Sequence, residues 1–539
     1  MRRRRGDRYL IPYLVHQLVE EQARIGPDRE LLVTHEPGAG RFSYGAVNAA
    51  ANRMARLFGQ LGVARGDRVA ILAHNGLEYV AAYYGALKAG AVAVPLNTAA
   101  DPHSLAHYCG DSGAAVLVAG ARLERLVIQT GARLDGLRAV VSGAAARDAI
   151  AKAVPAPVAT FGDADGLEGG DLDRPLIDLD LASIIYTSGS TGRPRGATLT
   201  HGNLIANVRS IVQYLGLAPT DRVLAVLPFY YVYGKSILNM CVAAGATVVA
   251  ENRFQYPNVA LDTLEKERCT GFAGVPSTYA ILLNRSNLAE RVHGAGLADL
   301  AWVTQAGGGM SPALTRRLLE VLGPRRLHVM YGATEASARL AHLPPDELPA
   351  AIGSIGRAIP NVELTVRHPD GTPCAPGEVG ELFARGANVM VGYWNDPDET
   401  GRALGPFGYA TGDLARCDER GLIWLVGRKK DMLKVGGHRV AAKEIEDALL
   451  EHPEVHEVAV IGIPDELLGD KLRAFVVLRT AGAVDAAGLG GFLKDRLAAY
   501  KIPDHFELRS ELPKNESGKI MKEILRAEVS VAQGRNDQV

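Results

Sequence analysis

Short apolar runs alternate with helical stretches along this chain, and no other feature of the sequence constrains the fold as strongly. Residues 69–72 are typical of a strand, 79–89 of a helix, and 91–94 of the next strand. Strands that alternate with helices favour parallel sheets covered by helices. In such folds, ligands bind at loops beyond the carboxyl ends of the strands. Further strand-like runs occur at 223–227, 246–250, 300–304 and 327–330.

The character of the sequence changes near Gly427, where a charged stretch, 428–431, separates two apolar runs. Because 539 residues are too many for one core, we expect more than one domain. We predict an α/β fold with a large N-terminal domain of parallel-rich sheets covered by helices, 1–428, and a small mobile α+β domain, 429–539. Residues 121–180, rich in Ala, Gly and Asp, are typical of a variable surface region. In the small domain we expect a helix at 443–451, strands at 455–463 and 472–478, and a helix at 492–499.

The run from Tyr186 to Gly196 combines glycines, hydroxyl side chains and two arginines. Glycines let the backbone approach a ligand, consecutive N–H groups can surround an anion, and arginine suits phosphate oxygens. An apolar strand at 181–185 precedes the run and a helical pattern at 204–215 follows it, so we predict a polyphosphate site. The spacing is neither that of a P-loop nor that of a dinucleotide-binding loop. The residues assigned to this site are Thr187, Ser188, Gly189, Ser190, Thr191, Gly192 and Arg195.

Composition and charge exclude several classes of function. The chain has 59 Lys and Arg against 60 Asp and Glu, and this net charge of −1 argues against nucleic-acid binding. No apolar run is long enough to span a bilayer. The arginines at 2–5 are followed by no uninterrupted apolar segment, so we interpret them as a solvated tail rather than a secretory signal. The five cysteines show no metal-ligand spacing and are expected to be free thiols in a reducing cytoplasm.

Three further motifs contain acidic or basic residues that suit nucleotide chemistry. The run 331–335, Tyr-Gly-Ala-Thr-Glu, follows a predicted strand and ends in a carboxylate, a group that Mg²⁺ prefers. The run 409–413 ends in Asp413, whose carboxylate can accept hydrogen bonds from both ribose hydroxyls. The run 512–520 contains Lys519 in a Gly-Ser turn. Each motif alone is typical of an exposed turn, so the argument rests on their order along the chain.

In this order the motifs resemble those of the adenylate-forming superfamily, which includes acyl-CoA synthetases, adenylation domains of peptide synthetases and luciferases. In the phosphate loop, Ser190 replaces the family's usual threonine and keeps the hydroxyl, and Arg195 replaces a lysine and keeps the charge. A non-catalytic nucleotide sensor on the same fold is the alternative. It should lack Lys519 or Glu335, and both are present. Weaker matches occur at 42–44, 87–90, 274–278 and 306–309.

The resemblance implies a role for each matched residue. Tyr331 would stack on adenine, Thr334 would contact the α-phosphate, and Glu335 would hold Mg²⁺. Asp413 and Arg428 would bind the ribose. The other residues assigned to nucleotide binding are Gly307, Gly308, Gly332 and Lys434.

The resemblance also implies a reaction in two halves. A carboxylate first attacks the α-phosphate of MgATP, giving acyl-AMP and pyrophosphate. Lys519 would contact both anions and offset their repulsion. The small domain would then rotate about Lys430, and the face carrying Gly436 and Gly437 would admit a pantetheine thiol. Arg253 lies where some members bind a CoA phosphate, which favours coenzyme A over the alternative acceptor, an acyl carrier protein.

The run 228–235 aligns with the family's acyl-pocket entrance. Tyr231 stands where amino-acid-activating members have an aspartate and many acyl-CoA members a histidine, which disfavours an α-amino acid. We expect Tyr231 and Tyr233 to form part of an aromatic wall. Lys235 would either pair with a second carboxylate of the substrate or, more commonly, form a salt bridge or be solvated. Gly309 ends a three-glycine run that leaves room for the acid, and we expect a fatty, branched or aryl acid.

Overall fold

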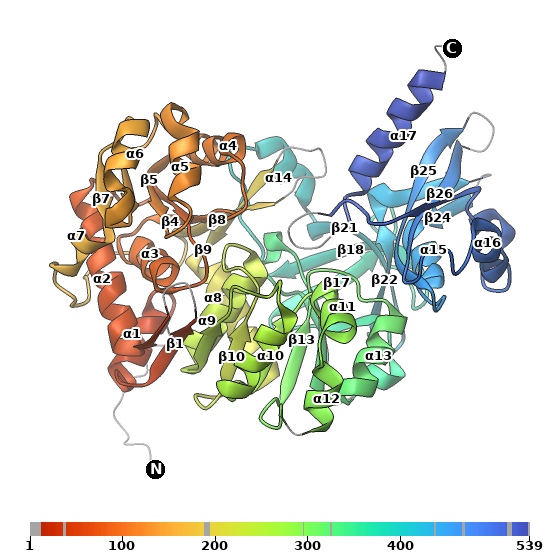
Figure 1. Cartoon of the computed structure of the whole chain (residues 1–539), viewed down its shortest axis with the longest axis horizontal. Helices are drawn as coiled ribbons and strands as arrows, with labels where there is room; N and C mark the ends of the chain where they lie inside the picture. The colour runs from red at the N-terminus through yellow and green to blue at the C-terminus, as the bar shows by residue number, and fades with distance from the viewer. Residues whose placement is uncertain are drawn as a thin grey trace.

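The computed structural model describes residues 12–35, 39–187, 194–294, 296–323, 326–435, 438–465, 469–514 and 520–536. Within these ranges the chain forms two large sheets and a small third sheet (Figure 1). The strands of the third sheet all follow Arg428 in the sequence. The α/β fold with a small C-terminal sheet is therefore confirmed, whereas the boundary at 428 and the mobility of the small domain stay predictions.

The first large sheet has eight strands in the order β19-β9-β8-β4-β3-β5-β6-β7. From β8 to β7 the strands are parallel, and β9 and β19 add antiparallel pairs at one edge. The strands are β3 (Arg68–Leu72), β4 (Val92–Pro95), β5 (Ala114–Ala119), β6 (Ala139–Ser142), β7 (Val158–Thr160), β8 (Leu181–Thr187), β9 (Arg195–Thr200) and β19 (Gly392–Tyr393). The helices that accompany it are α3 (Leu77–Lys88), α4 (Pro102–Ser112), α5 (Glu124–Thr130), α6 (Arg147–Ala153) and α7 (Phe161–Asp165).

Residues 121–180 belong to this sheet and its helices, so their interpretation as a variable surface region is wrong. Val140 and Val141 of β6 are fully buried. A four-residue apolar run in an Ala- and Gly-rich segment gives a weak strand signal, and pairing with β5 decides its conformation.

The second large sheet has 14 strands, in the order β17-β18-β21-β22-β16-β15-β14-β13-β12-β10-β11-β1-β2 with β20 beside β21. The strands from β14 to β1 are parallel, as the alternation predicts, but the sheet continues past β14 through antiparallel strands. The strands are β1 (Glu30–Thr34), β2 (Gly40–Ser43), β10 (Arg222–Ala225), β11 (Thr247–Ala250), β12 (Gly271–Gly274), β13 (Trp302–Gln305), β14 (Leu327–Tyr331), β15 (Ala341–Leu343), β16 (Ser354–Ala358), β17 (Val362–Arg367), β18 (Val379–Gly386), β20 (Leu404–Gly405), β21 (Gly408–Cys417) and β22 (Ile423–Arg428). The remaining helices of this part are α1 (Gln17–Ile25), α2 (Tyr44–Gln60), α8 (His201–Leu215), α9 (Val232–Ala244), α10 (Pro257–Lys266), α11 (Pro276–Arg285), α12 (Leu288–His293), α13 (Pro312–Leu322) and α14 (Pro397–Ala403).

Helices fill the space between the two large sheets and cover their outer faces (Figure 1). Because successive strand residues point to opposite faces, Ile71 of β3 packs in one core with α2, α3, α8, α9 and Val223 of β10. Leu72 packs instead against the outer helices α4 to α6, and Leu224 against α10 to α13. The large part of the molecule is thus a five-layered arrangement of helices and sheets.

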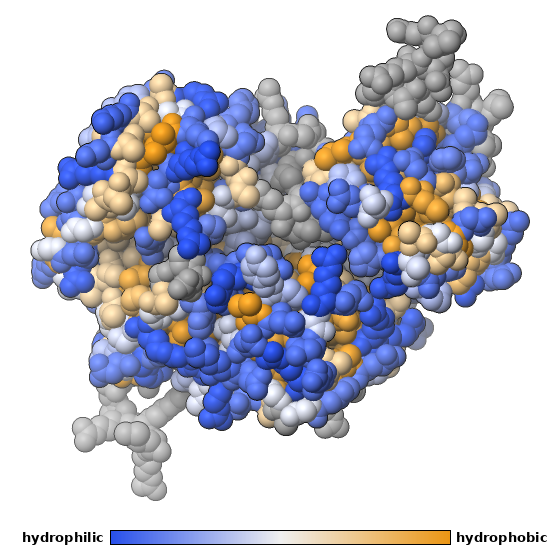
Figure 2. Space-filling view, viewed as in Figure 1, coloured by the Kyte–Doolittle hydropathy of each residue, from blue (hydrophilic) through white to orange (hydrophobic). Residues whose placement is uncertain are grey.

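The small sheet has the order β24-β23-β26-β25, with β27 beside β26. It packs apolar residues on both faces. The predicted helix at 492–499 is wrong, because α16 occupies 486–494 and residues 499–501 form a 3-10 turn. The elements are β23 (Met432–Val435), β24 (His438–Ala441), α15 (Ala442–Leu449), β25 (Val455–Asp465), β26 (Gly469–Leu478), α16 (Ala486–Lys494), β27 (His505–Arg509) and α17 (Lys522–Asn536). On the visible face of the molecule hydrophilic residues predominate, with smaller hydrophobic patches among them (Figure 2).

Candidate active site

The predicted phosphate loop connects β8 to β9. Thr187 ends β8 and pairs with Arg195 at the start of β9, and Thr187 Oγ1 donates to Arg195 O at 3.4 Å. The expected order of strand, loop and helix omits β9, whose six residues separate the loop from α8. The alternation in β9 is a strand signal that the following helical pattern conceals. Ser188, Gly189, Ser190, Thr191 and Gly192 lie outside the described residues.

Arg195 belongs to a series of polar contacts at the base of this loop. Its guanidinium lies 2.5 Å from Glu399 Oε2 and 5.7 Å from the ring centroid of Tyr393. The Tyr393 hydroxyl donates to Glu335 Oε1 at 2.8 Å. Burial, and then the Glu335 carboxylate, raise the pKa of Tyr393, so the phenol remains a donor at neutral pH. Glu335 and the half-buried Thr334 therefore lie beside the phosphate-loop hairpin.

The predicted adenine and ribose residues meet at the end of β14. The Tyr331 hydroxyl donates to Asp413 Oδ2 at 2.5 Å. Arg428 Nε lies 2.6 Å from Asp413 Oδ1, and the two residues pair directly across β21 and β22. Burial, and then Asp413, raise the pKa of Tyr331 well above its ordinary value. A carboxylate offers about four acceptor positions, so ribose hydroxyls would share Asp413 with the residues already bound to it.

A strained turn follows the Tyr-Gly-Ala-Thr-Glu motif. Ser337 has φ 58° and Ala338 has φ 120°, a backbone conformation that side-chain-bearing residues rarely adopt. A Cβ on Gly332 would lie 1.8 Å from Ala338 O, so glycine is required there. Beyond this turn the chain carries Arg339 into the interior, where the residue is 2% exposed.

Tyr233 of α9 faces the second large sheet. Its hydroxyl donates to Thr304 O at 3.1 Å and lies 2.9 Å from Thr304 Oγ1. The guanidinium of Arg339 lies 4.0 Å from the centroid of the Tyr233 ring. A Cβ on Gly307 would lie 3.9 Å from Tyr233 Cδ1. The Tyr233 ring therefore has Gly307 and Arg339 as neighbours in space.

Tyr231 and Gly309 are also assigned to the acyl pocket, and Gly308 lies between Gly307 and Gly309 in the glycine run. The rings of Tyr230 and Tyr231 pack with centroids 4.4 Å apart, and an aromatic wall that joins Tyr231 with Tyr233 stays a prediction. A Cβ on Gly308 would only touch a proline ring, at 3.4 Å. A Cβ on Gly309 would lie 3.5 Å from Lys443 Cε of the small unit. The position of the acyl group against this wall stays a prediction.

The commoner interpretation of Lys235, a salt bridge or a solvated side chain, is wrong. Lys235 is 1% exposed, its amine donates to Ser183 Oγ at 2.7 Å, and it lies 5.0 Å from the centroid of the Tyr83 ring. No carboxylate of the described residues lies within 4.0 Å of this amine, and burial lowers its pKa well below the ordinary value. Residues two positions apart point to opposite sides of a helix. Lys235 therefore faces the first sheet, away from Tyr233, and the structure gives no support for its pairing with a substrate carboxylate.

Two family models match this chain. The model described as AMP-binding enzyme matches residues 19–394, and that described as AMP-binding enzyme C-terminal domain matches residues 444–519. The chain belongs to the AMP-binding enzyme family. The predicted resemblance to adenylate-forming enzymes is thereby confirmed.

Relatives of this AMP-binding enzyme match over nearly its whole length. Feruloyl-CoA synthase of an Amycolatopsis species is 33% identical over 508 residues, which cover 94% of this chain and 97% of the relative. Long-chain-fatty-acid–CoA ligase of Salmonella typhimurium is 33% identical over 504 residues, which cover 88% and 87%. The solved structure of the anthranilate CoA ligase AuaEII in complex with anthranoyl-AMP has a TM-score of 0.87 at 26% identity and covers 97% of this chain and 99% of that one.

The residues assigned to domain rotation and thiol transfer lie on several elements of the enzyme. Lys430, at the predicted hinge, lies in a 3-10 turn with its amine 3.5 Å from Glu523. Lys434 is exposed on β23. Two guanidinium nitrogens of Arg253, Nε and Nη2, each donate to an oxygen of the buried Glu251 carboxylate at 2.8 Å. Gly436, Gly437 and Lys519 lie outside the described residues.

Sequence reasoning missed Tyr393, Glu399 and Arg339 as site residues. Tyr393 lies 58 positions from Glu335, so no local pattern links them. Arg339 does have a signal, because it is the one charged residue in the otherwise small or apolar run 336–341. Across the described part of the enzyme, no helix combines the length and the apolar composition needed to cross a bilayer.

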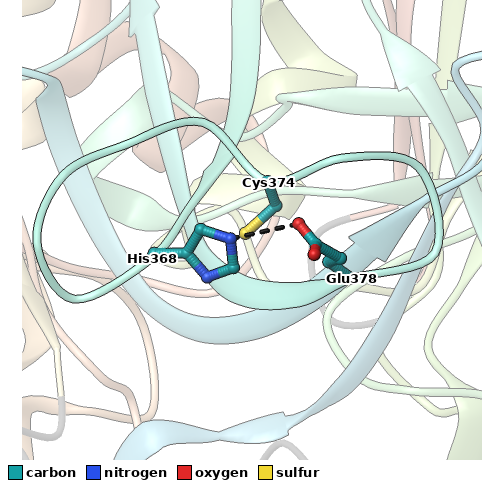
Figure 3. Close-up of side chains that lie close together, drawn as sticks. All are labelled: His368, Cys374 and Glu378. Carbon is teal, nitrogen blue, oxygen red and sulfur yellow. Dashed lines mark hydrogen bonds and ion pairs between the residues drawn. The ribbon is translucent and has the colours of Figure 1, made fainter.

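A His–Cys–Glu group occupies the turn between β17 and β18 (Figure 3). The ligand atoms of His368, Cys374 and Glu378 all lie within 4.8 Å of one another. Glu378 Oε2 lies 3.1 Å from His368 Nε2 and accepts the Ala375 N–H at 2.7 Å, so the carboxylate already closes this turn. All five cysteines are free thiols, as expected.

Proposed function

We propose that this enzyme is an acyl-CoA ligase, which activates a carboxylic acid with ATP and transfers the acyl group to coenzyme A. The observation that carries the proposal is the group formed by Asp413 of β21 with Tyr331 and Arg428, which end β14 and β22. It is a ready acceptor for a ribose in a chain whose relatives are named as CoA ligases. The free cysteines are in keeping with the reducing cytoplasm that we propose as its location.

In the first half-reaction the acid carboxylate attacks the α-phosphate of ATP and pyrophosphate leaves. Catalysis of this step is mostly positioning and charge stabilisation. Asp413 would hold the ribose, Thr334 would donate to the α-phosphate, and Arg195 would neutralise phosphate charge while it stays anchored to Glu399. Lys519 would supply the cation between the two reacting anions.

The chemistry at Glu335 fits Mg²⁺. The cation prefers oxygen ligands, and Glu335 presents a carboxylate of which one oxygen accepts the Tyr393 hydroxyl. The acceptor positions that remain on this carboxylate suit a cation, and the phenol fixes its orientation. When bound, Mg²⁺ would neutralise charge on the phosphates of ATP.

In the second half-reaction a thiol attacks the acyl-adenylate and AMP leaves. The small unit would rotate about Lys430 between the two halves, bringing Gly436 and Gly437 toward the site. Arg253 is held by Glu251 and remains partly exposed, so it offers a cation for a CoA phosphate. The wall formed by Tyr231 and its neighbours supports an acid with a fatty, branched or aryl body.

The test is ATP–pyrophosphate exchange by the purified enzyme with Mg²⁺ across fatty, branched, aryl, dicarboxylic and amino acids. We expect exchange with one class of acid, and acyl-CoA formation when coenzyme A is added. If the enzyme catalyses exchange and loads a phosphopantetheinyl carrier protein but forms no acyl-CoA, the acceptor is the carrier protein and not coenzyme A. ATP binding without exchange for any acid would favour the nucleotide sensor.

A further inference from the structure

Arg339 is a buried cation that lacks a carboxylate partner. Its Nε donates to Met330 Sδ at 3.4 Å and its Nη1 to Ala338 O at 3.2 Å, and the guanidinium lies over the Tyr233 ring. No Asp or Glu oxygen in the described ranges comes within 4.0 Å of it. Arginine remains charged inside proteins, and the groups that satisfy this guanidinium are a sulfur, a carbonyl, the Tyr233 ring and the Tyr214 hydroxyl, none of which carries a negative charge.

The side chains next to Arg339 include a tyrosine and two histidines. Tyr214 stacks on His342 with ring centroids 4.2 Å apart, and His342 Nε2 lies 2.9 Å from His328 Nδ1. Burial, and then the charges of His328 and Arg339, lower the pKa of His342 to about 3, so this imidazole is neutral at physiological pH. Tyr214 and His342 therefore bring no negative charge to Arg339.

The backbone holds Arg339 in place at a cost. The residue follows the strained turn of Ser337 and Ala338. Two asparagines fix the turn, because Asn207 Nδ2 and Asn388 Nδ2 each donate to Arg339 O at 2.9 Å. Ser337 Oγ also donates to Asn388 O at 2.8 Å. Strain that several bonds maintain is typical of functional positions.

Arg339 borders the region assigned to the acyl group. Gly307, Tyr233 and Arg339 are consecutive neighbours, so the Tyr233 ring separates the guanidinium from the space beside Gly307. An anion would reach Arg339 when this ring turns aside. It would replace a cation–π contact with an ion pair, the stronger interaction in a desolvated site.

We propose that Arg339 binds a second carboxylate on the acid substrate, so that the enzyme selects dicarboxylic acids. The proposal rests on the proposed ligase function and narrows its substrate class. Arg339 lies four residues after Glu335, which limits the separation of their Cα atoms to about 14 Å. A short or aryl diacid therefore fits this arrangement better than a long chain.

The experiment compares diacids with uncharged partners of the same shape, namely adipate with monomethyl adipate and terephthalate with monomethyl terephthalate. We expect wild-type kcat/KM for pyrophosphate exchange to be at least 100-fold higher for one of the diacids than for its half-ester. In Arg339→Met we expect this preference to be lost because kcat/KM for the diacid falls, while kcat/KM for the half-ester changes less than fivefold. Arg339→Lys should restore part of the preference. Lys235→Met, which removes a buried amine on the opposite side of α9, should keep it.

Equal losses for diacid and half-ester in Arg339→Met would overturn the proposal and make Arg339 a structural residue. Wild-type preference for the half-esters would also overturn it while leaving the ligase function intact. If Arg339→Met does not fold, wild-type inhibition by acyl-sulfamoyl adenosines that carry a diacid or its half-ester decides the same question, and a diacid preference below threefold sinks it. Absence of exchange with every acid, including monoacids, would instead contradict the proposed function.

Discussion

The nucleotide side and the acyl side of the site treat charge in opposite ways. Asp413 is paired with Arg428 and Arg195 with Glu399, whereas Arg339 is buried without a carboxylate among the described residues. ATP is the same in every turnover, so donors and acceptors held in advance cost no reorganisation when it binds. A buried cation without an anionic partner destabilises the folded protein until an anion binds. Such a cation therefore favours ligands that carry a negative charge at that position.

Two buried basic side chains, Lys235 and Arg339, differ in how they can relieve that cost. Lys235 can lose its proton, and burial favours this because it lowers the pKa of the amine. Ser183 Oγ stays hydrogen-bonded to the amine. A guanidinium cannot lose its proton in a protein, so Arg339 can be relieved only by an anion. The comparison therefore separates a structural lysine from a candidate recognition arginine.

The largest effect is expected at the cation that would link the two sides. Lys519→Ala should lower pyrophosphate exchange by about 10³-fold, because a charge that acts on the developing transition state is lost. Thioester formation from supplied acyl-AMP should remain within a few fold of wild type. Equal loss in both half-reactions would remove this role from Lys519.

The paired nucleotide side is tested by Asp413→Asn. We expect the KM for ATP to rise about 10- to 100-fold, since hydrogen bonds to a charged group contribute about 1.5–3 kcal/mol. The KM for the acid should stay within about threefold. Tyr331→Phe is the matched control, because it removes the phenol bonds to Asp413 and Thr411 but keeps the carboxylate, and should raise the KM for ATP less. A rise shared by ATP and acid would break the division into two sides.

The pH dependence of folding tests Lys235. In the unfolded chain this lysine has its ordinary pKa near 10.5, and in the folded protein the pKa lies well below. Between the two values the unfolded state binds a proton that the folded state does not, so stability rises with pH across that window. Lys235→Met should remove up to about 1.4 kcal/mol per pH unit from this slope in urea unfolding over the pH units just below 10. Lys434→Met, at an exposed site, should leave the slope unchanged, and an unaltered slope in Lys235→Met would mean that the amine stays charged.

The smallest effect is expected for Arg195→Lys. A lysine keeps the charge that pairs with Glu399 but loses the planar contact with the Tyr393 ring. We expect the KM for ATP to change less than about fivefold, the size of a weak cation–π contact. A loss above about 50-fold in initial-rate assays would show that the guanidinium itself, rather than its charge, contacts the phosphates.

Much of the fold and part of the site follow from local patterns. Apolar runs and helical periodicity predict β3, α3, β4 and the parallel strands. The reason is that a strand buried on both faces consists almost entirely of apolar residues, which can be recognised in a short segment. Tyr331 ends the parallel strand β14, as the alternation predicts, whereas Asp413 and Arg428 meet because β21 and β22 pair in an antiparallel register. The order of those motifs also identifies the family.

Other features depend on neighbours that are distant in the sequence. β9 is a strand because it pairs with β8 and β19, and Glu335 is held by Tyr393 from 58 positions away. The helix period alone shows that Lys235 and Tyr233 point apart, but not which sheet each one meets. Whether a charged side chain is solvated, neutral or in need of a partner depends on all the groups packed around it. The sequence alone therefore suggested Lys235 as the partner of a second substrate carboxylate, whereas the packing of the core favours Arg339.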